Sequence, residues 1–154
     1  MKKHILFLLI ILFPFIGHSQ EWTEISQVLP IPYPNNANDF FAASIEIQDD
    51  IAVIGSYRTN QEKGCAYIFQ HNGTQWEKLA ILTASDSEAG DWFGFSVDIE
   101  DDVIVVGAMF KNNGYTKNGK AYVFEKPASG WEDLTETCSL SGSSCYNYAY
   151  YGRA

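Results

Sequence analysis

The chain has 154 residues, of which 46% are hydrophobic and 19% are charged, and its formal net charge is −9. This length predicts one domain at most, and an aromatic content of 10 Phe, 9 Tyr and 4 Trp excludes a disordered chain. The acidic balance argues against nucleic-acid binding, because phosphate recognition needs clustered Lys and Arg, and the basic residues after the N-terminus form no run.

The first twenty residues have the layout of a secretory signal peptide. Lys2 and Lys3 give a positive start, an apolar segment of about a dozen residues follows, and small residues precede a cleavage point before Gln20. The apolar segment is shorter than the roughly 20 residues needed to span a bilayer, although an uncleaved anchor is the alternative interpretation. We therefore expect residues 1–19 to be removed, which takes the formal charge from −9 to −11, and the mature chain to be secreted or at the cell surface of a bacterium.

The mature chain contains two similar copies of one segment. Residues 38–56 align with residues 90–108, and residues 64–69 align with residues 119–124. Residues 149–154 resemble the start of a further copy. A repeat of about 50 residues is typical of a solenoid, a propeller or an array.

Each copy predicts short β-strands and no helix. Phe93, Phe95, Val97 and Ile99 alternate with small or polar residues, which is the period of two expected for a strand. No window of the mature chain shows helical periodicity. In chain order, the predicted strands are a leading strand at 21–29, then 41–47, 51–56, 65–70 and 76–82 in the first copy, and 93–99, 103–106, 121–124 and a strand beginning at 131–134 in the second.

Four antiparallel strands in each copy predict an all-β fold made of β-propeller blades. The two blades occupy residues 38–82 and 90–140, within a single repeat region at 20–154. One such sheet has two apolar faces, so it must stack against a neighbouring sheet, and a single copy is not expected to be stable. Two blades cannot close a ring of typically four to eight, so the predicted propeller is incomplete.

The second copy carries a family resemblance. Phe93-Gly94, Ser96-Val97, Val106-Gly107-Ala108 and Ala121–Phe124, in that order, resemble the FG-GAP repeat, which is the blade unit of the integrin α-chain propeller and of many exported bacterial proteins. The first copy departs from this pattern, with Ala42 in place of the glycine.

The resemblance implies a seven-bladed β-propeller in complete family members. The chain supplies a leading strand, two blades and the start of another at 149–154, so it is expected to be a fragment of a longer propeller. A truncated reading frame and a protomer that assembles with others are the alternatives. Because unpaired strand edges favour association, we also expect self-association through the unpaired blades.

Two acidic segments are candidates for a bound cation. Integrin-type repeats, which the chain resembles, often hold Ca²⁺ in a loop after the Phe-Gly strand, but Asp98–Asp102 is a tight turn that cannot wrap an ion. Asp86, Glu88 and Asp91 lie in a Gly-containing loop, for which a turn that orients the next strand is the favoured interpretation and Ca²⁺ the alternative. We therefore expect no cofactor and no metal site.

The cysteines leave two interpretations open. The exported location permits disulfides, and Cys138 and Cys145 flank a loop that one disulfide would close. The alternative is three reduced or buried thiols, and Cys65 is expected to pack as a small hydrophobic residue. No cysteine spacing indicates zinc or redox chemistry.

The sequence contains no catalytic motif of the common hydrolase, metalloprotease or nucleotide-binding kinds. His71 lies in a polar turn, where an exposed side chain is expected. Trp22, Trp76 and Trp131 recur at the same repeat position, which predicts packing within the blades rather than ligand stacking. We therefore assign no catalytic residue and expect a protein that is not an enzyme.

These observations predict an exported, non-catalytic protein that binds an extracellular protein or glycan, or mediates adhesion, with no membrane span after signal cleavage. Loops 57–63 and 108–117 differ most between the copies, and specificity is expected there. The alternative is the scaffold part of an exported propeller enzyme, such as a carbohydrate-active hydrolase or lyase. A third interpretation is a fragment with no function by itself.

Overall fold

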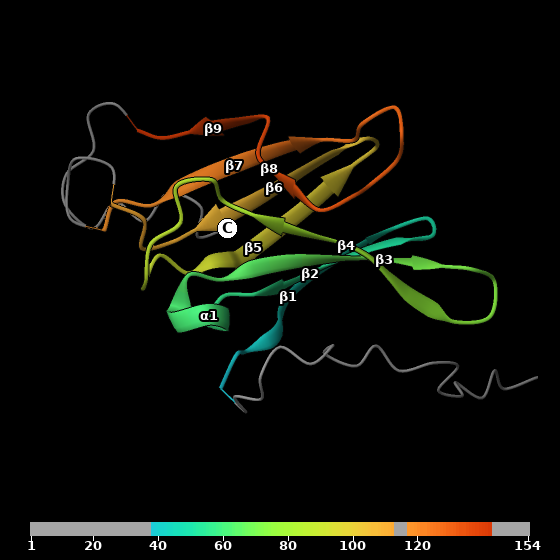
Figure 1. Ribbon diagram of the computed structural model, residues 1–154, viewed down its shortest axis with the longest axis horizontal. Coiled ribbons are helices and arrows are strands. Elements are labelled where there is room, and N and C mark those ends of the chain that lie inside the picture. The colour runs from blue at the N-terminus through green and yellow to red at the C-terminus, as the bar shows by residue number, and fades with distance from the viewer. Residues whose placement is uncertain (1–37, 113–116, 143–154) are drawn as a thin grey trace, which may run out of the picture.

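The computed structural model describes residues 38–112 and 117–142, which fold into two β-sheets packed face to face (Figure 1). The predicted signal peptide at 1–19, the leading strand at 21–29 and the start of a further copy at 149–154 lie outside the described residues. The two sheets correspond to the two copies seen in the sequence. The all-β prediction is thus confirmed, with one five-stranded and one four-stranded sheet.

The first sheet is an antiparallel meander with one strand added from the second copy. Its strands are β1 (Phe41–Gln48), β2 (Ile51–Ser56), β3 (Cys65–His71) and β4 (Trp76–Thr83). The short β8 (Leu134–Thr135) pairs with β4 in parallel and makes a fifth strand. All four predicted strands of the first copy form within one residue of the expected bounds.

The second sheet contains β5 (Phe93–Glu100), β6 (Val103–Ala108), β7 (Lys120–Glu125) and β9 (Cys138–Leu140), all antiparallel. Three of these strands lie where the sequence predicts them. The fourth prediction was wrong, because the strand that completes this sheet begins at Cys138 and not at Trp131.

The segment around Trp131 leaves the second sheet because other groups hold it against the first. The Trp131 side chain is only 6% exposed and belongs to the core between the sheets. Asp133 accepts a hydrogen bond from the backbone N–H of Ile81 at 2.8 Å, and Glu136 accepts from the N–H and hydroxyl of Ser85 at 2.9 and 2.7 Å. The chain therefore crosses to the β4 edge of the first sheet, where it forms β8, and then returns to the second sheet as β9.

The main core lies between the two sheets. Alternation directs one face of the first sheet and one face of the second into it, as a two-residue period requires. The most deeply buried members are Val53, Ile68 and Leu82 from the first sheet and Phe93, Ile104, Val106, Tyr122 and Phe124 from the second. This arrangement confirms that each sheet covers an apolar face of its neighbour.

Three glycines set how closely the sheets approach. A Cβ atom on Gly94 would lie 2.3 Å from the backbone oxygen of Cys65, and one on Gly55 would lie 2.1 Å from the oxygen of Gly94. A Cβ on Gly64 would lie 1.9 Å from the oxygen of Phe93. The hydroxyl of Ser44 donates to the oxygen of Gly94 at 3.1 Å. Backbone thus meets backbone at this contact, and only glycine fits.

A single helical turn, α1 (Thr59–Glu62), follows β2, where the sequence predicts no helix. Its last three residues have φ of 53°, 59° and 64°, in the left-handed region that costs about 1–2 kcal/mol per residue. The carbonyl oxygens of residues 61–63 accept backbone hydrogen bonds from Gly90, Trp92 and Phe93 at 3.0–3.3 Å. The turn is therefore a docking element for the start of β5, and its left-handed backbone has no signature in helical periodicity.

Candidate functional site

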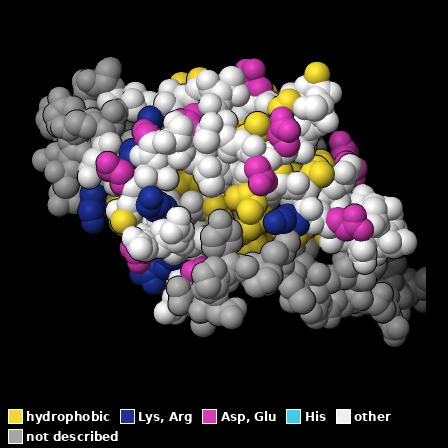
Figure 2. Space-filling view, in the orientation of Figure 1, with side chains coloured by type: hydrophobic (Ala, Val, Ile, Leu, Met, Phe, Trp, Pro, Cys, Tyr) yellow, Lys and Arg dark blue, Asp and Glu magenta, His cyan; other side chains and the backbone are white. Residues whose placement is uncertain are grey.

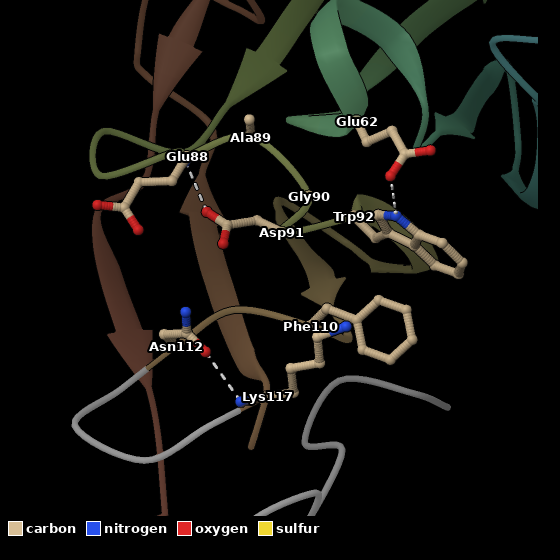
Figure 3. Close-up of a pocket in the computed structure, with 9 residues that line it drawn as sticks. All are labelled: Glu62, Glu88, Ala89, Gly90, Asp91, Trp92, Phe110, Asn112 and Lys117. Carbon is tan, nitrogen blue, oxygen red and sulfur yellow. Dashed lines mark hydrogen bonds between the residues drawn. The ribbon is translucent and has the colours of Figure 1, made fainter.

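Three loops meet at one end of the two sheets and form a pocket of about 270 Å³ (Figure 3). Glu62 comes from α1, Trp92 from the segment before β5, and Phe110, Asn112 and Lys117 from the loop between β6 and β7. Two of these loops are the ones that the sequence predicted to carry specificity. The fold brings them together with the acidic loop at 86–91, which the sequence had singled out separately.

One wall of the pocket is aromatic. The rings of Trp92 and Phe110 lie 4.4 Å apart between centroids, and Trp92 lies 4.8 Å from Tyr57. Phe40 continues the row at 5.2 Å from Tyr57 and is 48% exposed. Aromatic rings bury large areas with few rotatable bonds, so they suit ligand contact at a small entropic cost.

Cationic side chains lie over these rings. The Arg58 guanidinium is 4.8 Å from the centroid of Phe40 and 5.7 Å from that of Trp92, while the Lys117 ammonium is 4.7 Å from Phe110. Glu62 pairs with the Arg58 Nε at 3.2 Å and accepts a hydrogen bond from the Trp92 Nε1–H at 3.1 Å. Arg58 and Glu62 therefore fix the tilt of the Trp92 indole, and Figure 3 shows the hydrogen bond between Glu62 and Trp92.

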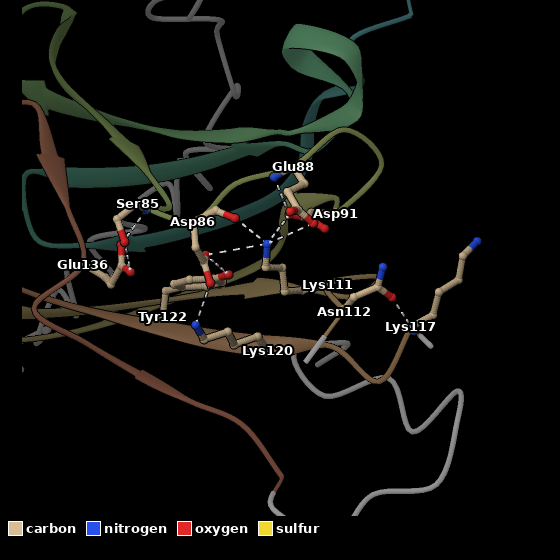
Figure 4. Close-up of polar contacts among 10 residues, drawn as sticks. All are labelled: Ser85, Asp86, Glu88, Asp91, Lys111, Asn112, Lys117, Lys120, Tyr122 and Glu136. Atoms are coloured by element: carbon tan, nitrogen blue, oxygen red, sulfur yellow. Dashed lines mark hydrogen bonds and ion pairs between the residues drawn. The ribbon is translucent and has the colours of Figure 1, made fainter. Parts of the chain in front are cut away.

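A buried lysine fills the acidic loop beside the pocket (Figure 4). The Lys111 side chain is 5% exposed, and its Nζ donates to the Asp91 carboxylate at 3.0 Å and to the backbone oxygen of Asp86. The carboxylates of Glu88 and Asp86 lie 3.8 and 3.9 Å from the same Nζ. The Asp91 side chain, also 5% exposed, accepts in addition from the N–H of Glu88 at 2.6 Å.

The loop at 86–91 thus closes around the ammonium group of Lys111. Lys111 takes the central position that a cation bound by Asp86, Glu88 and Asp91 would need. Within residues 38–112 and 117–142, no group of three or more His, Cys, Asp or Glu side chains is placed to hold a metal ion.

Asp86 connects this loop to the second sheet. Its carboxylate accepts from the Tyr122 hydroxyl at 2.7 Å and from the Lys120 ammonium at 2.8 Å. Partial burial acts to raise the pKa of Asp86, but the hydrogen bonds from Lys120 and Tyr122 and the charge of Lys111 outweigh it, so the pKa lies below its ordinary value. Burial and the hydrogen bond to Asp86 raise the pKa of Tyr122, so this phenol stays neutral.

The opposite end of the molecule carries a second, acidic hollow of about 460 Å³. It lies between the Asp49-Asp50 turn of the first sheet and the Asp101-Asp102 turn of the second. Gln48 bridges the two turns, because its amide oxygen accepts from the Asp101 N–H at 2.9 Å. Lys126 pairs with Asp102 at 3.0 Å. Both turns are tight two-residue connections, as the sequence predicted for Asp98–Asp102.

The remaining sequence candidates lie away from the pocket. His71 ends β3, is half-buried and packs on Trp76 at 5.1 Å, so it is less exposed than predicted. Trp76 begins β4 whereas Trp131 lies in a loop, so the two do not occupy equivalent places. Cys65 is a buried thiol, and burial raises its pKa.

Two other sequence candidates involve residues outside the described ranges. Cys138 is exposed with a free thiol, and its suggested partner Cys145 lies outside the described residues. Trp22 also lies outside them.

Phe110 and Lys111 lie within the loop at 108–117 that the sequence indicated, but neither residue was singled out there. The available signal was the alignment of the two copies, which places Lys111 opposite Thr59 and Phe110 opposite Arg58. Lys111, shortly after the predicted strand at 103–106, could have been paired with the preceding acidic loop. The distance in sequence from Asp86 and Asp91 concealed that pairing, which the antiparallel β5–β6 ladder produces by placing Phe93 opposite Ala108.

Comparison with known families decides the classification. The sequence profile of the FG-GAP repeat matches residues 22–69 and 76–124, more than half of the chain. The chain belongs to the FG-GAP repeat family. The second match runs from β4 through β7, so the family repeat begins in one sheet and ends in the next. No curated protein matches this FG-GAP chain.

The space-filling view shows the surface character of this FG-GAP protein (Figure 2). Acidic side chains are spread over the visible face, and hydrophobic side chains show near its middle. Among the described residues, no helix has the length and apolar character needed to cross a membrane.

Proposed function

We propose that this FG-GAP chain is an exported, non-catalytic binding protein that attaches to a glycan outside the cell or at the cell surface. The signal-peptide layout of residues 1–19 supports export. The β-propeller-like fold of stacked FG-GAP sheets supports a binding role, because such folds present loops at the ends of rigid sheets. The acidic composition is compatible with a neutral or cationic ligand and unfavourable for nucleic acid.

The pocket at the loop end is the observation that carries the proposal. It combines the faces of Trp92 and Phe110 with the polar side chains of Asn112, Glu88 and Lys117. Aromatic faces pack on the C–H groups of sugar rings, and neighbouring amide, carboxylate and ammonium groups bond to hydroxyls. The loops that supply these groups differ between the two copies, as a site specialised in one copy requires.

The state of the carboxylates supports the absence of catalysis. Glu62 is engaged by Arg58 and Trp92, and Asp91 is engaged by Lys111. A general acid or base needs a free route to the substrate proton. Paired with cations, these two carboxylates have the character of positioning groups rather than proton-transfer groups.

Binding of the mature protein to an array of glycans and extracellular proteins tests the proposal. Phe110→Ala and Lys117→Gln should each weaken glycan binding by about tenfold or more, since single anchor residues carry much of the binding energy. Trp76→Ala is the matched aromatic control outside the pocket and should bind as the native chain does. Equal binding by all variants, or binding only to proteins, would refute the glycan proposal.

The same preparation separates binding from the enzyme alternative. Incubation with the bound glycan should release no reducing ends and no unsaturated products. Release of either product would identify a hydrolase or lyase and overturn the non-catalytic proposal. Mass spectrometry of the secreted chain checks export, with an N-terminus at Gln20 as the expected result.

A further inference from the structure

The hairpin turn between β3 and β4 holds an Asn-Gly pair in a closed polar arrangement. The turn comprises residues 71–75, and Figure 1 shows the hairpin extending away from the body of the two sheets. The backbone N–H of Asn72 donates to the Gln75 oxygen at 3.0 Å, and the side chains from Asn72 to Gln75 are exposed. None of these residues lines the glycan pocket.

The side chain of Asn72 folds over the backbone that follows it. Its Oδ1 accepts hydrogen bonds from the Thr74 N–H at 3.0 Å, from the Thr74 hydroxyl at 2.8 Å and from the Gln75 N–H at 3.0 Å. The first of these bonds closes an Asx turn, a small ring that contains both the Asn72 Cγ and the Gly73 nitrogen. A bond between those two atoms would form a succinimide inside that ring, and Gly73 has no Cβ to hinder it.

The imidazole of His71 and the donors on Oδ1 both favour that reaction. The Gly73 N–H donates to the His71 Nδ1 at 3.3 Å, so the imidazole is placed to take the proton of the attacking nitrogen. The donors on Oδ1 face the oxygen on which negative charge develops when the carbonyl is attacked. His71 also packs on Trp76 at 5.1 Å between ring centroids, which holds the imidazole beside the turn.

We propose that Asn72 is a modification site at which the folded chain promotes the loss of its own side-chain amide. The Gly73 nitrogen bonds to the Asn72 Cγ and passes its proton to His71. The Cγ–Nδ2 bond then breaks, and its electron pair and that proton leave with Nδ2 as ammonia. Water opens the resulting succinimide at either carbonyl, which gives aspartate or isoaspartate. The site is independent of the glycan pocket.

The product carries a carboxyl group where the amide stood. In the native turn, the Asn72 Nδ2 donates to the Glu77 carboxylate at 2.7 Å, and the Gln75 Nε2 donates to the same oxygen at 2.9 Å. Conversion removes the first donor and sets two carboxylates against each other, which weakens the turn by like-charge repulsion. Because Asn72 is exposed and lies outside the core, the change is local to this hairpin.

Asn118-Gly119 is a matched comparison within the same chain. The Asn118 side chain is 0% exposed, and the Gly119 N–H donates to the backbone oxygen of Lys111 at 3.0 Å. A backbone carbonyl does not take up a proton as an imidazole does, so the Gly119 nitrogen has no base beside it at this bond. The amide of Asn118 therefore persists in the folded chain.

Peptide mapping of the mature chain by mass spectrometry, in native buffer and in urea, tests the proposal. Trypsin places Asn72 and Asn118 in different peptides. In native buffer Asn72 should lose its amide about tenfold or more faster than Asn118, and faster than Asn72 itself does in urea. In urea the two sites should react at similar rates, because each is an asparagine followed by glycine. Native Asn72 reacting no faster than unfolded Asn72 would overturn the proposal.

Substitution of His71 identifies the base. His71→Phe keeps an aromatic ring against Trp76 but has no Nδ1, so it should slow the loss of the Asn72 amide about tenfold in native buffer and leave the rate in urea unchanged. Gln75→Ala is the control, because it removes a bond to Glu77 and retains the backbone N–H on Oδ1. Hydrogen exchange of the β3–β4 ladder checks that the hairpin is formed in each variant. A native rate that His71→Phe leaves unchanged, with the ladder intact, would refute the role of the imidazole.

Discussion

The two sheets place different chemistry on the same backbone frame. In the first, the Asp39 oxygen accepts from the Arg58 N–H at 3.2 Å, and in the second the Asp91 oxygen accepts from the Phe110 N–H at 3.0 Å. At the next position the first sheet has Thr59, whose hydroxyl lies 2.7 Å from that of Ser56, while the second has Lys111 in its ion cluster.

That difference shows how a repeat is specialised without a change of fold. The backbone oxygen of residue 59 accepts from the Gly64 N–H, and that of residue 111 accepts from the Gly119 N–H, both at 3.0 Å. The loop after the second strand of each sheet is therefore closed by an equivalent backbone hydrogen bond. The side chain inside it decides whether the loop closes around a pair of hydroxyls or around an ion cluster, and both loops supply residues to the pocket.

The largest expected effect follows replacement of Gly94, where the two sheets touch. Gly94→Ala places a methyl group against the Cys65 backbone and forces a left-handed φ of 85° on alanine. Overpacking and backbone strain together should lower the free energy of unfolding by about 4–5 kcal/mol. Urea denaturation followed by tryptophan fluorescence measures this change.

Gly73→Ala is the matched control for Gly94. Gly73 also has a positive φ, at 96°, but a Cβ there would meet nothing within 4 Å. The loss should be about 1 kcal/mol, from conformational strain alone. Equal losses at the two positions would show that close contact between the sheets is not what requires glycine at 94.

Lys111→Met should have the next largest effect, because it removes the cation and leaves the buried Asp91 carboxylate without its partner. Breaking a buried ion pair costs about 3 kcal/mol or more. The double variant Lys111→Met/Asp91→Asn should recover part of this loss. Thermal unfolding measures the stability, and a double variant less stable than Lys111→Met would contradict the ion-pair account.

Ala42→Gly should stabilise the chain, in contrast to the losses at Gly94 and Lys111. Ala42 has a left-handed backbone where the second sheet has glycine, so relief of this strain should raise the free energy of unfolding by about 1 kcal/mol. The neighbouring Ala43→Gly should instead destabilise by about 0.5–1 kcal/mol. Dilute samples of the full chain keep this measurement separate from assembly.

The smallest effect is a pH dependence at Asp86. Because its pKa is lower in the folded chain, Asp86 stabilises the fold above its ordinary pKa of about 3.9, and this contribution disappears as the pH falls through the lower folded value. The Asp86→Asn variant should be less stable than the native chain near neutral pH, by under about 1 kcal/mol for so exposed a group. The difference should vanish in acid, and a difference that grows in acid would contradict the assigned sign.

The sequence was a good guide wherever the period of two and the internal repeat act together. Seven of the eight predicted strands of the described region form, because alternating side chains determine which face is buried. The exception at Trp131 arises from long-range contacts, since the hydrogen bonds of Asp133 and Glu136 to the first sheet compete with local strand propensity.

The candidate site was predictable only in parts. The loops at 57–63 and 108–117 were found by comparison of the two copies, and the acidic loop at 86–91 was found by its composition. The convergence of the loops at 57–63 and 108–117 depends on how the two sheets stack, and the contact of Lys111 with Asp91 depends on the pairing of β5 with β6. No local pattern encodes either arrangement. Calcium remained an alternative for the acidic loop because the sequence did not show that the Lys111 ammonium group, from another loop, lies among its carboxylates.

The three left-handed residues of α1 show that the pocket depends on contacts between the two sheets. Their left-handed backbone conformation is unfavourable in isolation. The N–H groups that bond to the carbonyl oxygens of residues 61–63 belong to the segment leading into β5. The position of Glu62, which bonds to Trp92, therefore depends on contacts with the second sheet. The pocket forms at the junction of the two sheets, so an isolated copy of either repeat would lack it even if its strands formed.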